Sequence, residues 1–249
     1  MRSTLDVSTI SNQYIPCSTF SPSQEAFLTT EFEKTVPCKT FSYKINEYGF
    51  RYDTTPKKKT ICFVGCSITF GVGLAQDQIF PELVTRKLGD DWQCINLGVP
   101  GSGPDIQMNN LNWALNNFKI DKVVWYMSDP MRQAFWKNHL HLVVPSFAND
   151  RKDDQKFMNH LVEFEDNTLM KTYWNLYSTF SLLKEKNVDT YVRCWISEYH
   201  SILLPLIREF NIKDFGNMKN MDKARDDMHH GPLSHEQFSK HLLGKINEI

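Results

Sequence analysis

From about residue 58 onward, short apolar segments alternate with longer amphipathic segments, and this alternation limits the possible fold more than any other feature. The apolar segments are typical of strands buried on both faces: KTICFVG, WQCINLG, DKVVWYMS and TYVRCWI, followed by a shorter one near IKDFGNM. Between them lie segments with helical spacing: DQIFPELVTRKLG, DIQMNNLNWALNNF, NTLMKTYWNLYSTFSLLKEKN and YHSILLPLIREF. Strands that alternate with helices predict an α/β fold of three layers, in which helices cover both faces of a mainly parallel five-stranded sheet.

The chain of 249 residues is long enough for one large domain with a sizeable core. We expect a single α/β domain over residues 58–249, with an insert at about 136–166 that lacks a clear period. The first 40 residues or so are polar, rich in Ser and Thr and aperiodic. Residues 1–57 are therefore predicted to form an extended arm that packs on the core.

Charge and hydropathy argue against several classes of partner. The formal net charge is -1 and the pI is about 6.7, so the composition does not favour a nucleic-acid partner. No stretch has the length and apolarity of a signal peptide core or a membrane span, which predicts no membrane partner and a cytoplasmic location. The six cysteines are scattered without a C-x-x-C pair, as expected for free thiols, and Cys17 and Cys38 are expected to pair only if the protein were exported. The sequence leaves the oligomeric state open.

A candidate nucleophile follows the first strand, in FVGCSITFGVG. Gly65 permits a tight turn directly after the strand, and Ser67 then stands where a helix can begin. A serine at a helix start has its backbone N–H unpaired, and the local dipole favours a developing anion. Taken alone, the same segment also fits an ordinary turn or a phosphate-binding loop.

Two further loops are expected at the same edge of the sheet. The second strand runs into INLGVPGSGPD, where the Gly101 N–H can face a carbonyl oxygen as an oxyanion donor. Before the last helix, ARDDMHHGPLSHEQF contains two D-x-x-H pairs, Asp226 with His229 and Asp227 with His230. Reactive groups gather at the carboxyl ends of parallel strands, so serine, glycine loop and histidine are predicted to converge. Such a set favours acyl transfer through a covalent serine ester.

These blocks, in this order, resemble those of the SGNH (GDSL-type) hydrolase superfamily, over about residues 58–247. The resemblance implies a flavodoxin-like sheet and a Ser-His-Asp triad. No cofactor is expected, and no metal either, because the histidines lack H-x-x-x-H or H-E-x-x-H spacing with a carboxylate partner. It assigns Ser67 as nucleophile and Gly101 as oxyanion donor. Because related members often read A-R-D-x-x-H, it selects Asp226 and His229 as the other two triad members, with His230 facing substrate or solvent. The segment NEYGFR also resembles one that precedes the serine block in some members and packs on their core.

The third block of the superfamily, usually G-x-N-D, reads YMSDPMR here. Ser128 stands where an asparagine amide helps to hold the oxyanion, and we expect its hydroxyl to take over as donor. A strand register shifted by one residue would instead place Asp129 in the cleft. Arg132 is expected either to bind a substrate carboxylate or phosphate or to form a salt bridge with Asp129, and the salt bridge is favoured.

The expected function is that of a serine esterase that removes an acyl group, by default acetyl, from a polar small-molecule or glycan substrate. The alternative is a catalytically weak or inactive binding or assembly protein on the same fold, which the missing asparagine favours. A Rossmann-type nucleotide binder is disfavoured, because the glycines of GCSITFG are wrongly spaced for G-x-G-x-x-G and no acidic residue ends the second strand.

Overall fold

The computed structural model describes residues 46, 48–52, 55–136, 140–143, 159, 165–224 and 229–248. Most of the predicted arm, most of the insert, Cys17, Cys38, Asp226 and Asp227 lie outside these residues. Among the described residues, no helix combines the length and the apolarity needed to cross a bilayer.

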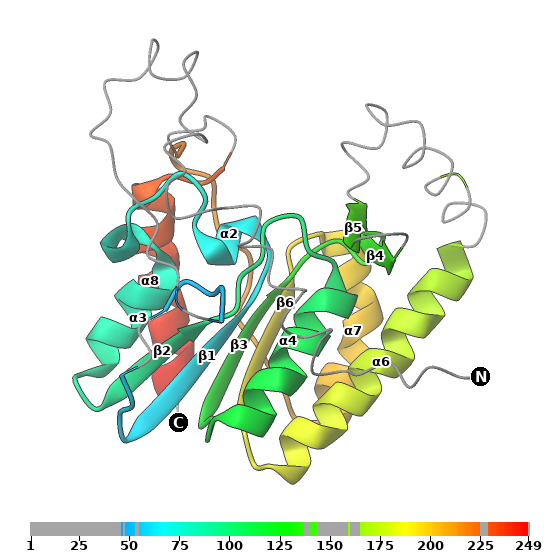
Figure 1. Ribbon diagram of the computed structural model, residues 1–249, viewed down its shortest axis with the longest axis horizontal. Helices are drawn as coiled ribbons and strands as arrows, with labels where there is room; N and C mark the ends of the chain where they lie inside the picture. Colours follow the sequence, from blue (N-terminus) through cyan, green and yellow to red (C-terminus); the bar gives the residue numbers. More distant parts are fainter. Residues whose placement is uncertain are drawn as a thin grey trace.

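A single parallel sheet forms the centre of the molecule (Figure 1). Its five strands lie in the order β2-β1-β3-β6-β7, and every pairing between them is parallel. The strands are β1 (Lys59–Gly65), β2 (Trp92–Asn96), β3 (Lys122–Met127), β6 (Asp189–Cys194) and β7 (Lys213–Asp214). The predicted α/β class with a five-stranded parallel sheet is confirmed.

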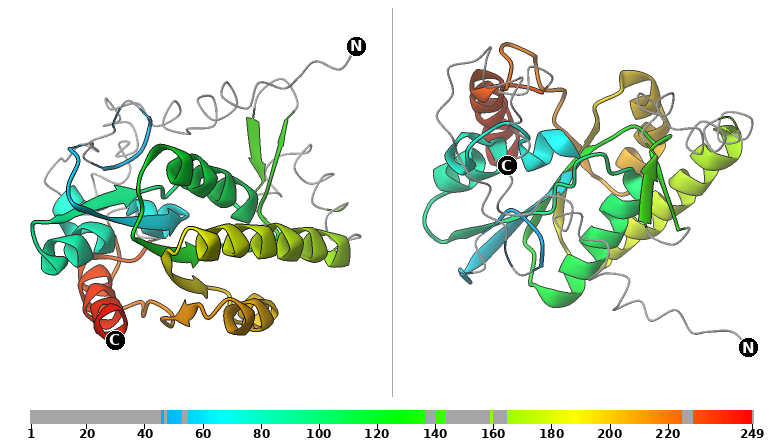
Figure 2. Two further views of the ribbon diagram at one scale, coloured as in Figure 1. Left: turned by 90° about the horizontal axis from the view of Figure 1, so that it is seen from below. Right: turned by 45° about the horizontal axis from the view of Figure 1, so that its top comes forward.

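Helices follow the strands and cover the sheet on both sides (Figures 1 and 2). They are α2 (Ser67–Phe70), the 3-10 helix η3 (Gln76–Gln78), α3 (Phe80–Leu88), α4 (Pro104–Asn117), α6 (Glu165–Glu185), α7 (Ser197–Glu209) and α8 (Pro232–Asn247). Apolar residues of α3 and α8 share one core cluster with Ile61 and Phe63 of β1, whereas α4 and α6 share another with Cys62 and Val64. The alternation of inward faces along β1 is what a strand buried on both sides requires.

The large apolar side chains of β1 are fully buried. Ile61 and Phe63 have no exposed surface, and the Phe63 ring packs edge-to-face on Phe80 of α3, with centroids 5.7 Å apart. Burying such a side chain stabilises the fold by roughly 1.5–3 kcal/mol. This packing fixes the carboxyl end of β1, where the candidate nucleophile follows.

A short antiparallel hairpin, β4 (Gln133–Trp136) with β5 (Leu140–Val143), was not predicted and lies at the start of the insert. It is joined to the start of α4, since the Asp105 carboxylate accepts the backbone N–H of Ala134 at 2.7 Å. Four-residue strands are too short for an alternating pattern to stand out in the sequence.

Candidate active site

Ser67 lies directly after the carboxyl end of β1, as the first residue of α2. Gly65 is required before it, because a β-carbon there would collide with Thr69 Oγ1 and would come within 2.7 Å of the Tyr126 carbonyl. The Ser67 side chain is half-buried, and its hydroxyl has one weak partner among the described residues, Cys66 Sγ at 3.9 Å. No described residue accepts the Ser67 backbone N–H, which leaves it available as a donor at the helix start.

A buried arginine holds the chain that leaves α2. The Arg51 guanidinium is fully buried and donates to the carbonyl oxygens of Phe70 at 2.9 Å, Gly71 at 2.8 Å and Leu74 at 2.6 Å. It also donates to the side chain of Gln76 at 2.8 Å. Arg51 belongs to the NEYGFR segment, in which sequence reasoning did not single it out. It thereby supports the turn after β1 that carries Ser67, called the serine turn below, from a segment that precedes β1 in the chain.

The glycine loop after β2 packs directly on the serine turn. The Asn96 amide donates to the Thr69 carbonyl at 2.9 Å, and its oxygen accepts the Gly98 N–H at 2.9 Å. A β-carbon on Gly98 would collide with the backbone nitrogen of Phe70. Gly101 is half-buried with a φ of +77°, and no described residue accepts its N–H. The loop therefore brings a second unpaired backbone donor close to α2.

Ser128 does not face the site as expected. It directly follows β3, as predicted, but its side chain is fully buried. Its hydroxyl donates to the Ser102 carbonyl at 2.7 Å and accepts from the Gln107 amide at 2.8 Å. A hydroxyl has one hydrogen to donate, and this one is committed inside the protein. The prediction that Ser128 donates to the oxyanion is therefore wrong for the arrangement seen here.

Asp129 and Arg132 lie on the segment after β3, and both are partly exposed. Burial raises the pKa of Asp129 although the Met131 N–H, which its carboxylate accepts at 2.8 Å, and Arg132 act in the opposite direction. No ion pair joins these two residues within the described chain, so the expected salt bridge is absent. The Arg132 guanidinium instead lies over the Trp195 ring, 5.4 Å from its centroid.

The loop before α8 that carries His229 and His230, called the histidine loop, lies beside the serine turn. Ala224, near its start, packs with Leu74 and Ile79, which belong to the segment after α2. His229 and His230 follow, both half-buried, and His230 pairs with Lys223 in an isolated antiparallel bridge. Burial lowers the pKa of His230, with Lys223 and His229 adding to the effect. Asp226 lies outside the described residues.

The residue that anchors this loop to α8 is Asp222, which sequence reasoning missed. Its carboxylate accepts the backbone N–H groups of Leu233 at 2.9 Å and Ser234 at 2.8 Å, and also the Ser234 hydroxyl at 2.7 Å. Partial burial raises the pKa of Asp222, but the hydrogen bonds from Leu233 and Ser234 outweigh it and the net shift is downward. The Asp222 carboxylate therefore stabilises the start of α8 in two ways: it accepts unpaired N–H groups, and its negative charge interacts favourably with the helix dipole.

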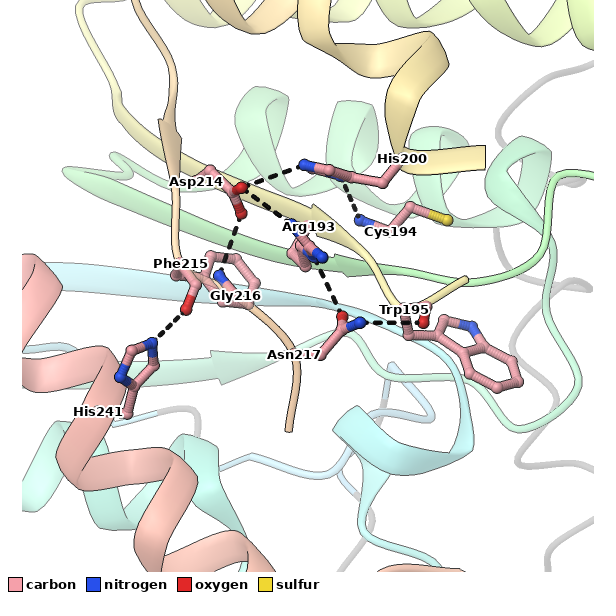
Figure 3. A network of polar contacts seen from close by, with 9 residues as sticks. All are labelled: Arg193, Cys194, Trp195, His200, Asp214, Phe215, Gly216, Asn217 and His241. Atoms are coloured by element: carbon pink, nitrogen blue, oxygen red, sulfur yellow. Dashed lines mark hydrogen bonds and ion pairs between the residues drawn. The ribbon is translucent and has the colours of Figure 1, made fainter. Parts of the chain in front are cut away.

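A second His–Asp pair, His200 with Asp214, lies between β6, β7 and α7 (Figure 3). His200 Nδ1 accepts the Cys194 N–H at 3.3 Å, which leaves Nε2 to donate to Asp214 at 3.1 Å. The ring is buried and both nitrogens are occupied, so this histidine has no free lone pair to act as a base. The sequence offers no local signal for it, because Asp214 follows His200 by 14 positions.

The same network also holds the segment directly after β7, which continues to the histidine loop (Figure 3). Arg193 joins the Asp214 carboxylate at 3.0 Å and the Asn217 amide oxygen at 3.1 Å, and His241 of α8 donates to the Phe215 carbonyl at 2.5 Å. These contacts fix the segment that follows β7.

The predicted residues thus divide into two groups. Ser67, the Gly101 loop and the histidine loop lie at the carboxyl edge of the sheet, around α2 and the start of α8 (Figure 1). The Ser67 hydroxyl makes no hydrogen bond to His229, and catalytic hydrogen bonds are often long before substrate binds. Ser128 also stands at the end of β3, but its hydroxyl is buried against Ser102 and Gln107. Within the described part of the chain, no group of three His, Cys, Asp or Glu side chains has the arrangement of a metal site.

No protein-family model and no curated protein matches the sequence. Similar solved structures include TesA, at 13% identity and a TM-score of 0.51, covering 76% of this chain and 98% of that one. The psychrotrophic esterase EstA from Pseudoalteromonas sp., inhibited by monoethylphosphonate, is 15% identical with a TM-score of 0.50, covering 76% and 97%. A lipolytic protein of the G-D-S-L family from Desulfitobacterium hafniense DCB-2 is 8% identical with a TM-score of 0.51, covering 75% and 98%. At these identities the similarity establishes the fold alone: this chain has the fold of the SGNH (GDSL-type) hydrolases, as its sequence blocks predict.

Proposed function

We propose that this protein is a serine esterase with Ser67 as nucleophile, His229 as general base and Asp226 as the residue that orients the imidazole. The observation that carries the proposal is the half-buried Ser67 at a helix start, beside a glycine loop whose Gly101 N–H has no acceptor among the described residues. Two backbone donors beside a serine hydroxyl match what a tetrahedral acyl intermediate needs.

The reaction follows from these positions. His229 takes the proton of the Ser67 hydroxyl as Oγ attacks the acyl carbon, and the carbonyl oxygen becomes an oxyanion held by the Ser67 and Gly101 N–H groups. His229 then gives its proton to the leaving alcohol, and the acyl group stays on Ser67 as an ester. Water, deprotonated by His229, attacks that ester and releases the carboxylic acid. With Ser128 turned inward, this oxyanion hole has two donors in the described part of the chain.

The substrate proposed is a short acyl ester, acetyl by preference, of a polar alcohol such as a carbohydrate. The partly exposed carboxyl of Asp129 and guanidinium of Arg132 support a polar alcohol, since both lie on the segment after β3 and offer hydrogen bonds rather than apolar surface.

The test is covalent labelling of the full chain with a fluorophosphonate probe, a relative of the phosphonate that inhibits EstA. We expect one adduct, located at Ser67 by mass spectrometry and lost in Ser67→Ala. The matched control is Ser201→Ala, because Ser201 is an exposed serine on α7 and its loss should leave labelling unchanged. Labelled wild type should also hydrolyse p-nitrophenyl acetate more slowly in proportion to the adduct.

A second candidate function is non-catalytic binding or assembly on the same fold. The inward Ser128 favours it, since removing one oxyanion donor costs on the order of 100- to 1000-fold in rate. Folded wild type that takes no phosphonate after long exposure would establish this second candidate over the esterase.

A further inference from the structure

A closed polar network lies beneath the glycine loop, within the protein. Its members are Ser102 in the loop, Gln107 in the first turn of α4, Trp125 in β3 and Ser128 just after β3, and none of the four has any exposed surface. None of them was assigned a supporting role from the sequence. Most buried polar groups in proteins have hydrogen-bond partners, and a fully satisfied network makes the structure around it rigid.

Gln107 is the centre of this network. Its amide oxygen accepts the Trp125 indole N–H at 2.8 Å. Its amide nitrogen donates to Ser128 Oγ at 2.8 Å and lies 3.2 Å from both the carbonyl oxygen and Oγ of Ser102. Two hydrogens therefore serve three acceptors, with one hydrogen shared by the two oxygens of Ser102.

The partners fix the direction of every bond. Because an indole N–H only donates, the oxygen of the Gln107 amide must face Trp125 and the nitrogen must face the serines. Because the Ser102 carbonyl only accepts, the Ser128 hydroxyl donates to it at 2.7 Å and must accept from Gln107. The network has one consistent arrangement of protons and no spare donor.

The network reaches both candidate oxyanion donors. Ser102 directly follows Gly101, and its hydroxyl donates to the Gly65 carbonyl at 3.3 Å, two residues before Ser67. The Val99 N–H donates to the same carbonyl at 3.0 Å, and the Ser102 N–H donates to Val99 at 3.1 Å. Ser102 is thus held through its carbonyl, its hydroxyl and its N–H.

We infer that Gln107 is the positioning residue of the oxyanion hole: by holding Ser102 and Ser128 from below, it sets where the Gly101 N–H lies relative to Ser67. The inference rests on the proposed esterase function. It also gives Ser128 a different task from the one that the superfamily's third block suggests, since this serine supports the glycine loop instead of touching the substrate.

The consequence is a selective effect on the transition state. A donor displaced by about 1 Å loses on the order of 100-fold in rate. Hydrogen bonds to an oxyanion strengthen as charge develops, so their loss lowers kcat and leaves KM nearly unchanged. The proton transfer by His229 does not pass through the network, so the shape of the pH–rate profile should not change.

The test compares Gln107→Met, which keeps the side-chain length but removes all polar contacts of Gln107, with Ser128→Ala. The second variant removes the two hydrogen bonds of the Ser128 hydroxyl and should disturb folding less. We expect kcat for p-nitrophenyl acetate to fall by about 10- to 100-fold in Gln107→Met and by a smaller factor in Ser128→Ala, each with KM within about twofold of wild type. Ser128→Asn should lower kcat as well, since a larger side chain at a fully buried position must displace its neighbours.

The matched control is Asn110→Ala. Asn110 is buried one turn further along α4, and its amide nitrogen has no hydrogen-bond partner in the described residues. Its loss should leave kcat, KM and the phosphonate labelling rate of Ser67 unchanged. Wild-type kcat in Gln107→Met and Ser128→Ala, or a higher kcat in Ser128→Asn, would overturn the inference.

Amide hydrogen exchange separates this inference from the proposed function. If wild-type Ser67 takes no phosphonate, the esterase proposal fails, and the positioning role is decided by exchange at the Val99 and Ser102 N–H groups. Gln107→Met should speed exchange at both by at least about tenfold relative to Asn110→Ala, because local opening governs these amides. Equal exchange in the two variants would show that Gln107 does not hold the loop.

Discussion

The histidines of the described chain differ in what their ring nitrogens contact, and these contacts separate candidate bases from structural side chains. His200 and His241 are tied to Asp214 and to the Phe215 carbonyl, as Figure 3 shows. His235 accepts the Phe80 N–H through Nδ1 at 3.0 Å and is almost fully buried. His229 and His230 lie on the loop before α8, beside the serine turn, and both are half-buried.

Substitution of these two histidines tests the proposed register. His229→Ala should lower kcat by on the order of 10,000-fold, whereas His230→Ala should cost far less, because only His229 is proposed to accept the Ser67 proton. Asp226→Asn should likewise cost more than Asp227→Asn. Steady-state ester hydrolysis by the four variants checks this, with folding confirmed by circular dichroism. An inactive His230→Ala beside an active His229→Ala would move the triad by one residue.

At the scale of elements, the histidine loop and α8 form one unit because Asp222 joins them. The helix begins at Pro232 after Gly231, and its first free N–H groups point back to a carboxylate ten or more residues earlier in the chain. Gly231 has to be a glycine here, since a β-carbon would collide with the Asp222 carboxylate. The loop that carries His229 is thereby held at both ends.

Asp222→Ala should destabilise the protein by about 1–2 kcal/mol at pH 7, the usual range for losing a helix cap. Because the folded-state pKa of Asp222 lies below its ordinary value, this stability is present above the unfolded pKa of about 3.9 and is lost as pH falls through the lower folded pKa. Urea denaturation should therefore show a constant difference from wild type between pH 7 and about pH 5, and a shrinking one below about pH 4.

The control for this cap is Asp91→Ala, which removes an exposed ion pair with Lys58. Such surface pairs contribute at most about 1 kcal/mol. Equal losses in the two variants at pH 7 would mean that Asp222 is no more than a surface carboxylate.

At the scale of the whole molecule, α3 and α8 are joined across one face of the sheet by a neutral histidine. Burial, with nearby His230 and Arg51, lowers the pKa of His235 to about 3. Its Nδ1 lone pair is occupied by the Phe80 N–H, so protonation there would break the link between the helices. Burial also lowers the pKa of His200, which acts on stability in the same direction.

The protein should consequently lose stability in mild acid. An unfolded histidine takes up a proton near pH 6.5 and the folded His235 only near pH 3, so the free energy of unfolding falls by up to about 1.4 kcal/mol for each pH unit between these values. In His235→Gln, which keeps an acceptor for Phe80 but does not titrate, urea denaturation should show a smaller slope between pH 6.5 and about pH 4.5. Parallel slopes for wild type and variant would rule out a buried neutral His235.

The sequence by itself determined how the five strands of the parallel sheet and their helices alternate along the chain, and the edge at which the serine and glycine loops meet. Each strand is a local apolar run, each helix has a local period, and the carboxyl ends of parallel strands must share one edge. The position of Ser67 directly after β1 therefore followed from the pattern alone.

Only the tertiary structure decided which way the side chains at that edge point and what holds them. Ser128 stands at the predicted end of β3, but its direction is set by Gln107, 21 residues earlier. The Arg51 contacts span 19 to 25 residues, and His200 meets Asp214 across two elements. A motif fixes where a residue stands along a strand, whereas the rotamer of a buried polar side chain depends on donors and acceptors that the fold brings from distant segments.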